Sequence, residues 1–536
     1  MRKNISILLL FLIAGFVTNL NAQPVPRDWH MMDYQKDHVY GISIEKAYTE
    51  LLKNKKSTPV VVAIIDSGID TLHQDLKGVL WHNPRTKANN PDNDKNSYEG
   101  DVFGWNFIGG KDPKNNVTKD TEESLRFYFK YKERFVNVTS ENQLKKNDRK
   151  LYQDWTRSKA GLLAKTKEGK VIVLINNTLG LCEEFNILFK KEQNKQIYTL
   201  TDLNEYKTED LKLSSHLKSY IKLLKNRKVG TTNIQFAEML NQKKDSLNKL
   251  QRISDTLLVN YRDKIVGDNY NDFNDRFYGN NNIMAGDCMH GTHVAGIIGA
   301  VRNNGVGMNG VADNVKLMMI RTIPDGDEHD KDVALAIRYA VDNGAKIINM
   351  SFGKAFSPER KWVEKAIRYA SRKNVLIVKS AGNDGVNCDS IVFYPTAKYM
   401  NSNKIVPNVI TVGASGPGTK ETGIVAPFSN YGKIMVDVFA PGTSIYSTVP
   451  GGNKYKMMDG TSMASPVVTG LAAVLKSYYP HLSAKKIKRI IEESVTKINE
   501  PVGKPNSKEK VSMTELCRSG GIVNAYEAIK LAEKMK

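Results

Sequence analysis

The chain has 536 residues, which is enough for two to four ordinary domains or for one large α/β domain that carries an insertion. Its composition, 40% hydrophobic and 25% charged, is that of a globular protein and excludes a disordered chain. The formal net charge is +21, but the basic residues are spread along the chain, with no Arg-rich arm and no recognisable nucleic-acid-binding module. We therefore expect no nucleic-acid partner.

The first 22 residues have the pattern of a secretory signal peptide. Arg2 and Lys3 precede an apolar run at 5–17, and the small residue Ala22 stands at a plausible cleavage point. A membrane anchor is the alternative, but about 13 apolar residues are fewer than the roughly 20 that a spanning helix needs. We predict an exported protein (periplasmic, cell-surface or extracellular) with no second spanning run and no stable membrane insertion after signal removal.

A buried parallel strand is expected at residues 60–68, after an amphipathic stretch at 42–52. Its consecutive apolar residues end in Asp66-Ser67-Gly68, so that Asp66 lies at the edge where open parallel sheets bind ligands. Residues 23–112 are interpreted as the first part of an α/β domain.

Residues 113–265 differ in composition and are interpreted as an inserted module. Between 121 and 260 there are 27 Lys and Arg against 17 Asp and Glu. Apolar residues at helical spacing predict two helical faces. These residues are Leu213, Leu217, Ile221 and Leu224 on one face and Leu240, Leu247, Leu250 and Leu257 on the other. We predict a mostly helical module with one short strand-like piece at 170–175.

The α/β pattern returns in the last part of the chain, residues 266–536. Apolar strands alternate there with helical patterns, which predicts a three-layer α/β fold with a mainly parallel central sheet and helices on both faces. The expected strands are 315–321, 346–353, 375–383 and 409–415, and the expected helices include 332–343, 358–373 and a final one at 520–534.

Asp66, His290 and Ser462 are candidate catalytic residues because each lies at a strand end or a helix start, with glycine or alanine nearby that leaves space for a polypeptide substrate. His290 opens the stretch HGTHVAG, and Ser462 lies in a glycine turn that leads into a long apolar helix. A serine hydroxyl becomes a nucleophile when a histidine removes its proton and a carboxylate orients that histidine. A serine at a helix N-terminus also places a developing oxyanion near the positive end of the helix dipole.

The two histidines at 290 and 293 raise the alternative of a metal site. His-x-x-His lacks the i, i+4 spacing and the glutamate of a zinc-peptidase helix, and no Cys/His cluster supplies further ligands. We therefore interpret His290 as part of a proton relay and expect the chemistry to need no metal and no cofactor. The cysteines are Cys182, Cys288, Cys388 and Cys517. A bridge between Cys288 and Cys388 and two buried free thiols remain alternatives.

Five stretches resemble the signature blocks of the subtilisin-like serine proteases (subtilases, peptidase family S8), in that family's order. They are VVVAIIDSGID, HGTHVAGIIGA, NMSFG, SAGNDG and DGTSMASPVVTGLAAVLK. The resemblance covers residues from about 28 to 112 and 266 to 536 and leaves out the inserted module. It implies a serine endopeptidase that cleaves polypeptides through an acyl-enzyme.

By this resemblance, Asp66 is the orienting carboxylate, His290 the general base and Ser462 the nucleophile. Asn383 matches the side chain that donates to the oxyanion together with the backbone N–H of Ser462. His293 is then expected to be a packed helix residue.

The resemblance also implies how substrate and calcium would bind. Ser351-Phe352-Gly353 matches the segment that pairs with the substrate backbone and walls the first specificity pocket. Phe393 falls at the base of that pocket, where a bulky ring would favour small side chains. Asp75 matches a position that ligates calcium in many relatives, but the loop at 302–310 is not a clear match to the other ligands, so structural calcium is left open.

The sequence differs from the family's pattern in two ways, both of which bear on the inserted module. Asp66 and His290 are 224 positions apart because the module lies between them, and only about 35 residues separate the signal from the first strand, too few for the inhibitory pro-domain of many relatives. We expect that the enzyme folds without a pro-domain or that the insertion does part of that job. A lid, a docking arm and a solubilising appendage are the alternatives for the module.

Two other functions remain as alternatives. One is a restricted processing protease for a few exported precursors, and the other is a non-catalytic binding protein on a protease fold, with the basic module as its working surface. The sequence makes no prediction of the oligomeric state.

Overall fold

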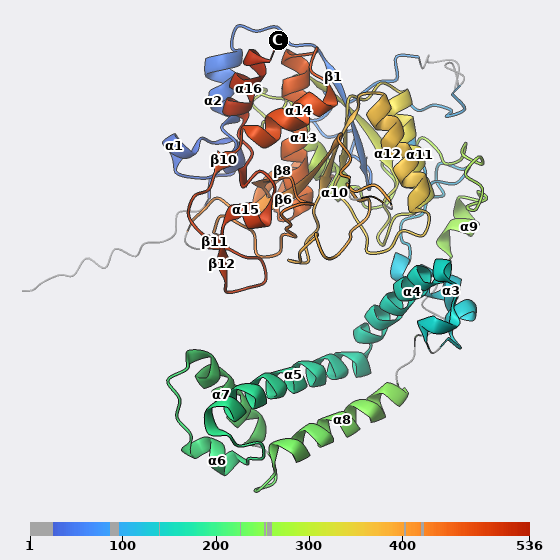
Figure 1. The fold of residues 1–536 in the computed structure, drawn as a ribbon. Helices are drawn as coiled ribbons and strands as arrows, with labels where there is room; N and C mark the ends of the chain where they lie inside the picture. The colour runs from blue at the N-terminus through green and yellow to red at the C-terminus, as the bar shows by residue number, and fades with distance from the viewer. Residues whose placement is uncertain are drawn as a thin grey trace, which may run out of the picture.

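The computed structural model describes residues 25–85, 96–138, 140–225, 227–250, 253, 260–400, 402, 404–419 and 423–535. The predicted signal peptide, 1–22, and Leu257 lie outside these residues. Figure 1 shows an α/β body from which a helical module projects on one side.

A nine-stranded sheet forms the centre of the body, in the order β10-β13-β7-β6-β5-β4-β1-β3-β2. All neighbours pair in parallel except β10, which pairs antiparallel with β13 at one edge. The strands are β1 (Val60–Asp66), β2 (Gly104–Asn106), β3 (Val315–Arg321), β4 (Ile347–Met350), β5 (Leu376–Ser380), β6 (Val409–Ser415), β7 (Val438–Pro441), β10 (Thr496–Lys497) and β13 (Gly521–Ile522). The predicted mainly parallel sheet is confirmed.

Helices cover both faces of this sheet (Figure 1). The side chains of β1 alternate between two cores: Val62 and Ile64 enter one, and Ala63 and Ile65 enter the other. The first core contains α10 (Met289–Gly299), α13 (Thr461–Tyr478), α14 (Ala484–Glu493) and α16 (Ala525–Lys534); the second contains α11 (Asp330–Asp342) and α12 (Arg360–Arg372). The three-layer prediction is therefore confirmed, although the helix expected at 520–534 begins only at Ala525, after strand β13.

Shorter elements complete the body. They are the helices α1 (Tyr34–Asp37), α2 (Ile44–Ala47) and α15 (Met513–Leu516), the hairpin of β8 (Ile445–Val449) with β9 (Lys454–Met458), and the pair β11 (Val502–Gly503) and β12 (Lys510–Val511). All four cysteines are free, so Cys288 and Cys388 form no disulfide.

The inserted module is helical and has two parts. The helices α3 (Glu123–Phe135) and α4 (Lys146–Lys165) share an aromatic cluster with Phe356 of the body, while α5 (Lys167–Gln193), α6 (Leu200–Glu205), α7 (Leu211–Leu224) and α8 (Asn233–Leu250) share a separate core around Phe185 and Tyr220. The short helix α9 (Tyr261–Ile265) leads back to the body. The proximal part therefore belongs to the body's surface, and the distal part packs mainly on itself.

Two predictions about the module need correction. The piece at 170–175 is not a strand but lies inside α5, whose first turn is capped by the Thr166 side chain accepting from the backbone N–H of Gly169 at 2.9 Å. A short apolar run does not by itself distinguish a strand from a helix. The face of Leu213, Leu217 and Leu224 is buried as predicted, but Leu250 is 65% exposed and does not join the core.

Helix α5 also bears on the membrane prediction. Among the described residues it is the one helix long and apolar enough to cross a membrane by length and composition alone, which departs from the expectation of no second run that could span. The criterion is weak evidence, since helices of soluble proteins meet it as well.

Candidate active site

Asp66 and His290 are held together at the carboxyl end of strand β1. Asp66 is 1% exposed, and its Oδ1 accepts from the backbone N–H of Ser67 at 2.7 Å and from Nδ1 of His290 at 2.7 Å. The close approach of α10 to the strand end depends on Gly291, where a Cβ would lie 2.1 Å from the carbonyl oxygen of Gly68. The carboxylate therefore fixes the imidazole with Nδ1 protonated and leaves Nε2 as the basic nitrogen.

The pKa of His290 is raised above 6.5. Burial acts to lower the pKa of the imidazole, but the charge of Asp66, its hydrogen bond and the charge of Asp287 together outweigh burial. The ring remains about one third exposed, at 34%. Among the described residues Nε2 makes no hydrogen bond, so this nitrogen is available to a reacting group.

Ser462 is the second residue of α13, directly after a turn that only glycine adopts readily. Gly460 has a φ of +150°, and the backbone N–H of Ser462 is one of the first N–H groups of the helix, which have no intrahelical acceptor. Its Oγ donates to the carbonyl oxygen of Ser351 at 3.0 Å. The hydroxyl is thus bonded to Ser351, and no hydrogen bond to His290 is present in the described part of the chain.

Asn383 is oriented as a donor. Its Oδ1 accepts from the backbone N–H of Thr461 at 2.9 Å and from Oγ1 of Thr461 at 2.8 Å. Both bonds place the carbonyl side of the amide against Thr461, so the NH₂ group is left to face the cavity that Asn383 lines together with Ser462.

Two adjoining cavities contain the candidate catalytic residues. One, of about 250 Å³, is lined by Ser462 and Asn383, and the other, of about 590 Å³, by Asp66 and His290. Both cavities are also lined by Ser351, Phe352 and Ile323. Helices α10 and α13 pack against each other behind them. The structure therefore brings all four residues to one edge of the sheet.

The predicted substrate-binding residues lie at the smaller cavity. Phe352, Gly353 and Phe393 line it, and Phe352 also lines the larger one. The hydroxyl of Ser351 lies 2.9 Å from the carbonyl oxygen of Ser462 and 2.7 Å from Oγ of Ser465, so this side chain holds α13 in place.

Four charged residues of the smaller cavity were not predicted: Asp327, Glu328, Lys379 and Asp384. Burial raises the pKa of Glu328 to about 7, although nearby Lys354 acts to lower it, and its Oε1 has no hydrogen-bond partner among the described residues. Lys379 donates to the carbonyl oxygen of Ser380 at 2.7 Å, and burial lowers the pKa of its ammonium group. The acidic run DGDEHD at 325–330, between a strand and a helix, was the signal that could have found the first two.

The surroundings of Asp75 do not fit a calcium ion. Its Oδ1 accepts from Nδ2 of Asn304 at 2.7 Å, and its Oδ2 accepts from the N–H of Met308 at 3.1 Å and from the hydroxyl of Tyr455 at 3.1 Å. Calcium takes six to eight oxygen ligands, whereas here one carboxylate is surrounded by hydrogen-bond donors. No cluster of three or more acidic, histidine or cysteine ligands occurs among the described residues.

His293 is a packed helix residue, as predicted. It is fully buried, its Nε2 lies 2.9 Å from the carbonyl oxygen of Lys456, and burial lowers its pKa to about 4. The ring is therefore neutral and is held by the β8–β9 hairpin.

The order and geometry of these residues agree with a comparison of the whole chain. The model of the subtilase family, peptidase S8, matches residues 57–512. The chain belongs to the subtilase family. This subtilase carries its insertion between the aspartate and histidine blocks.

Three relatives illustrate the similarity. The thermophilic serine proteinase of Bacillus sp. (strain AK1) is 42% identical over 241 residues, which are 45% of this chain and 52% of the relative. Thermitase of Thermoactinomyces vulgaris is 35% identical over 242 residues, 45% of this chain and 75% of the relative. The cell wall-associated protease of Bacillus subtilis (strain 168) is 36% identical over 230 residues, 42% of this chain and 23% of the relative. The chain thus matches about half of the first relative and under a quarter of the last.

Proposed function

We propose that this subtilase is an exported serine endopeptidase in which Ser462, His290 and Asp66 form the catalytic triad. The observation that carries the proposal is the 2.7 Å bond between His290 and Asp66, beside a cavity lined by Ser462 and by the free amide of Asn383. A carboxylate, an imidazole with a free Nε2 and a helix-terminal hydroxyl are the groups that acyl transfer needs.

The first chemical step requires a movement of one hydroxyl. We propose that rotation about the Cα–Cβ bond of Ser462 carries Oγ from the carbonyl of Ser351 to Nε2 of His290. His290 then takes the hydroxyl proton as Oγ attacks the substrate carbonyl carbon. The resulting oxyanion accepts from Nδ2 of Asn383 and from the N–H of Ser462 at the helix N-terminus.

The acyl-enzyme forms and breaks by the same groups. Protonated His290 gives its proton to the leaving amine as the C–N bond breaks, which leaves the acyl group on Ser462. A water molecule then loses a proton to His290 and attacks the ester, and the proton returns to Oγ as the acid product leaves. Asp66 stays ionised throughout and stabilises the imidazolium.

Export is supported by the charged and apolar N-terminal pattern and by relatives such as the cell wall-associated protease. A restricted processing protease is the narrower form of the proposal. The observation that favours it is that Thr118 and Lys119, where the chain enters the module, line the cavity of His290. A cleavage profile on denatured proteins separates restricted from broad specificity.

The test is active-site labelling with a fluorophosphonate. We expect the wild-type protein to be labelled and to cleave casein, and S462A to do neither. S465A is the matched control, since Ser465 lies on the same helix and, in the described part of the chain, its hydroxyl bonds to that of Ser351 and not to Ser462. Labelling or cleavage retained in S462A would remove Ser462 from the role of nucleophile and would favour a non-catalytic binding protein or another site.

A further inference from the structure

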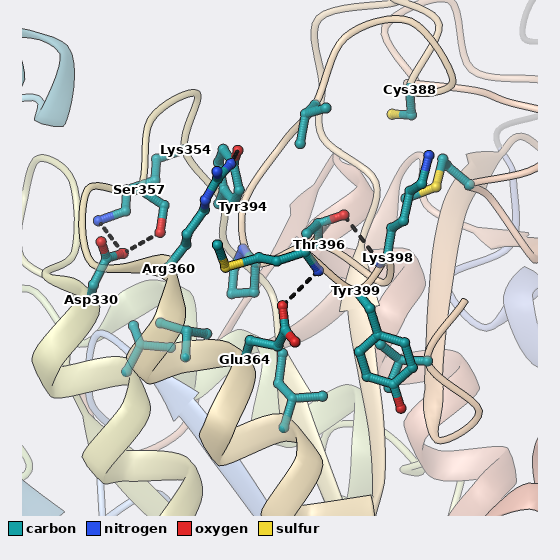
Figure 2. A pocket seen from close by; sticks show the side chains of 18 of the residues that line it. Asp330, Lys354, Ser357, Arg360, Glu364, Cys388, Tyr394, Thr396, Lys398 and Tyr399 are labelled. Carbon is teal, nitrogen blue, oxygen red and sulfur yellow. Dashed lines mark hydrogen bonds and ion pairs between the residues drawn. The ribbon is translucent and has the colours of Figure 1, made fainter. Parts of the chain in front are cut away.

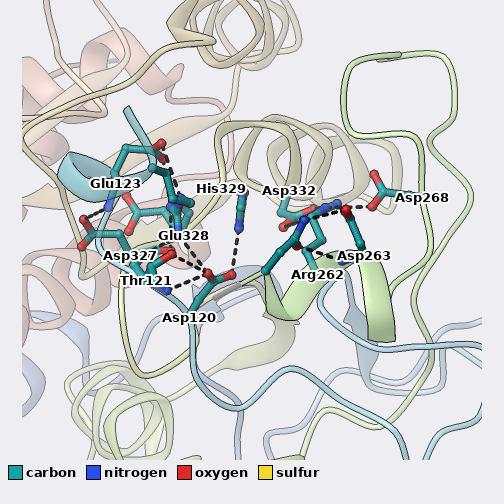
Figure 3. Close-up of polar contacts among 12 residues, drawn as sticks. Asp120, Thr121, Glu123, Arg262, Asp263, Asp268, Asp327, Glu328, His329 and Asp332 are labelled. Carbon is teal, nitrogen blue, oxygen red and sulfur yellow. Dashed lines mark hydrogen bonds and ion pairs between the residues drawn. The ribbon is translucent and has the colours of Figure 1, made fainter. Parts of the chain in front are cut away.

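A buried ion pair joins the first helix of the module to the substrate segment. Oε2 of Glu123, the first residue of α3, lies 2.7 Å from Nζ of Lys354, and the side chains are 6% and 1% exposed. Lys354 directly follows the predicted substrate segment 351–353, and its Nζ also lies 3.0 Å from Oδ1 of Asp330. Figure 2 shows Lys354 and Asp330 together, and Figure 3 shows Glu123 beside Asp327 and Glu328.

The backbone of Lys354 connects two walls of the Ser462 cavity. It exchanges two hydrogen bonds with Tyr394, each 2.9 Å long. Gly353 before it and Phe393 before Tyr394 both line the cavity. A displacement of Lys354 would therefore move both the substrate segment and the phenylalanine at the cavity's base.

Glu123 also lies against the opposite wall, formed by Asp327 and Glu328. Its backbone N–H donates to Oδ2 of Asp327 at 2.8 Å, and Lys354 donates to the carbonyl oxygen of Glu328 at 2.7 Å. Arg126, one turn further along α3, donates to the carbonyl oxygens of Asp327 and Glu328, both at 3.1 Å. The first turn of α3 thus contacts both segments that line the cavity.

Both charges of the pair are stabilised by their surroundings. Burial acts to raise the pKa of Glu123, but Lys354 and Arg126 outweigh it and hold that pKa well below its usual range. Burial acts to lower the pKa of Lys354, but Asp330 and Glu123 outweigh it and raise that pKa. Removal of the Glu123 charge would leave a buried ammonium with a poorer set of partners, which favours rearrangement of Lys354.

We propose that Glu123 is a positioning residue: through Lys354 it sets the separation of segments 326–328 and 351–353, so that the root of the module shapes the substrate cleft. This inference rests on the proposed function, because it assumes that the cleft binds a polypeptide beside Ser462. The inference gives the proximal helix α3 a role in substrate binding, so that the module would not be only a solubilising appendage.

The test compares E123Q with the wild type in a peptide assay and a labelling assay. For a peptide that extends several residues on the N-terminal side of the cleaved bond, we expect KM to rise about 10-fold and kcat to change less than about twofold, because a misplaced segment 351–353 would lose contacts that the bound substrate and the transition state share. The rate of fluorophosphonate labelling of Ser462 should stay within about twofold of wild type. E123D, which keeps the charge, should have a KM close to that of the wild type.

K130Q is the matched control. Lys130 and Glu359 also pair across the boundary between α3 and the body, at 2.8 Å, but their side chains are 40% and 27% exposed. K130Q should leave KM and labelling unchanged. The double variant E123Q/K354M removes both charges of the pair and leaves Asp330 bonded to the hydroxyl of Ser357 and the N–H of Glu359, each at 2.8 Å. It should show the same rise in KM if E123Q alone does not fold.

Three outcomes distinguish failure of the positioning role of Glu123 from failure of the proposed function. An unchanged KM in folded E123Q or in the double variant would overturn the inference. Equal loss of labelling and of peptide cleavage would also overturn it, since that result would mean a general loss of structure. Failure of the wild-type protein to be labelled would instead contradict the proposed function.

Discussion

Nδ1 of His290 lies 2.7 Å from Oδ1 of Asp66, although 224 positions of sequence separate the two residues. The end of β1 and the start of α10 meet at this bond, and the whole inserted module lies between them in the chain. The pairing therefore depends on the body's sheet and on the glycines at the strand end and is not interrupted by the insertion.

The first prediction concerns the carboxylate of Asp66. In D66N the amide can donate to Nδ1, so the imidazole would carry its proton on Nε2 and could not accept the proton of Ser462. We expect kcat to fall by about 10⁴-fold, with folding unchanged. Peptide hydrolysis normalised to titrated active sites measures this change, and D66N with kcat within tenfold of wild type would contradict the role of Asp66.

The pH profile provides the second prediction. His290 acts as a base only when its imidazole is neutral. Because its pKa is raised above 6.5, the acid limb of the kcat/KM profile should lie above pH 6.5, and activity should be lost as the pH falls through the pKa of His290. Asp287 contributes to that rise, so D287N should move the limb to lower pH without lowering the plateau. A limb that stays in place in D287N would mean that another group controls it.

Asn383 gives the third prediction. N383A should lower kcat by about 10²–10³-fold with little change in KM, a magnitude that is borrowed from the equivalent asparagine of a subtilisin and does not come from this structure. T461V keeps the backbone donor to Asn383 but removes the hydroxyl, so it should lose much less activity. Single-turnover acylation rates measure both, and equal losses in the two variants would argue against a direct contact with the oxyanion.

Phe393 gives the fourth prediction. The ring lines the Ser462 cavity, so F393G should enlarge it and raise kcat/KM for substrates with Phe or Leu before the cleaved bond relative to those with Ala. The expected change in that ratio is about 10-fold, which is the lower end of what one methylene group is worth in a hydrophobic specificity pocket. An unchanged preference would place the side-chain pocket elsewhere.

The last prediction concerns the return of the chain from the module. Arg262 is 4% exposed, and its two terminal nitrogens lie 2.5 and 2.9 Å from the two carboxylate oxygens of Asp332 (Figure 3). R262M would leave that carboxylate buried with fewer partners and should lower the free energy of unfolding by roughly 3–5 kcal/mol. The exposed pair of Lys130 is the comparison, where K130M should cost about 0–1 kcal/mol. Urea unfolding followed by fluorescence measures both.

Much of the body and its site could be predicted because the information is local. The apolar run that ends in Asp66 identifies a strand and places Asp66 at the edge of the sheet. The small residues that follow His290 identify a helix whose start lies at the same edge. The parallel sheet follows from the alternation of such runs with amphipathic helices.

Other features depend on contacts between distant segments. Glu123 and Lys354 are 231 positions apart, and neither residue type is by itself a sign of a buried pair. The same limit applies to Ser462, whose hydroxyl bonds to Ser351, and to the run at 170–175, whose helical state depends on the residues that flank it in α5. The buried pair, the hydrogen bond of Ser462 and the helical state of 170–175 all depend on residues that the local sequence pattern does not identify.

The module leaves and re-enters the body at nearly the same place. Asp120, just before α3, bonds to His329 at 2.8 Å, and Arg262, in α9 at the end of the module, bonds to Asp332, three residues after His329. The free-energy cost of closing a loop grows only with the logarithm of the loop's length, by about 0.6 kcal/mol per doubling. An insertion whose two ends are anchored at neighbouring points therefore adds little to the free-energy cost of folding the catalytic domain. We therefore expect that lengthening or shortening the distal helices would leave the two anchors, and the catalytic domain beneath them, in place.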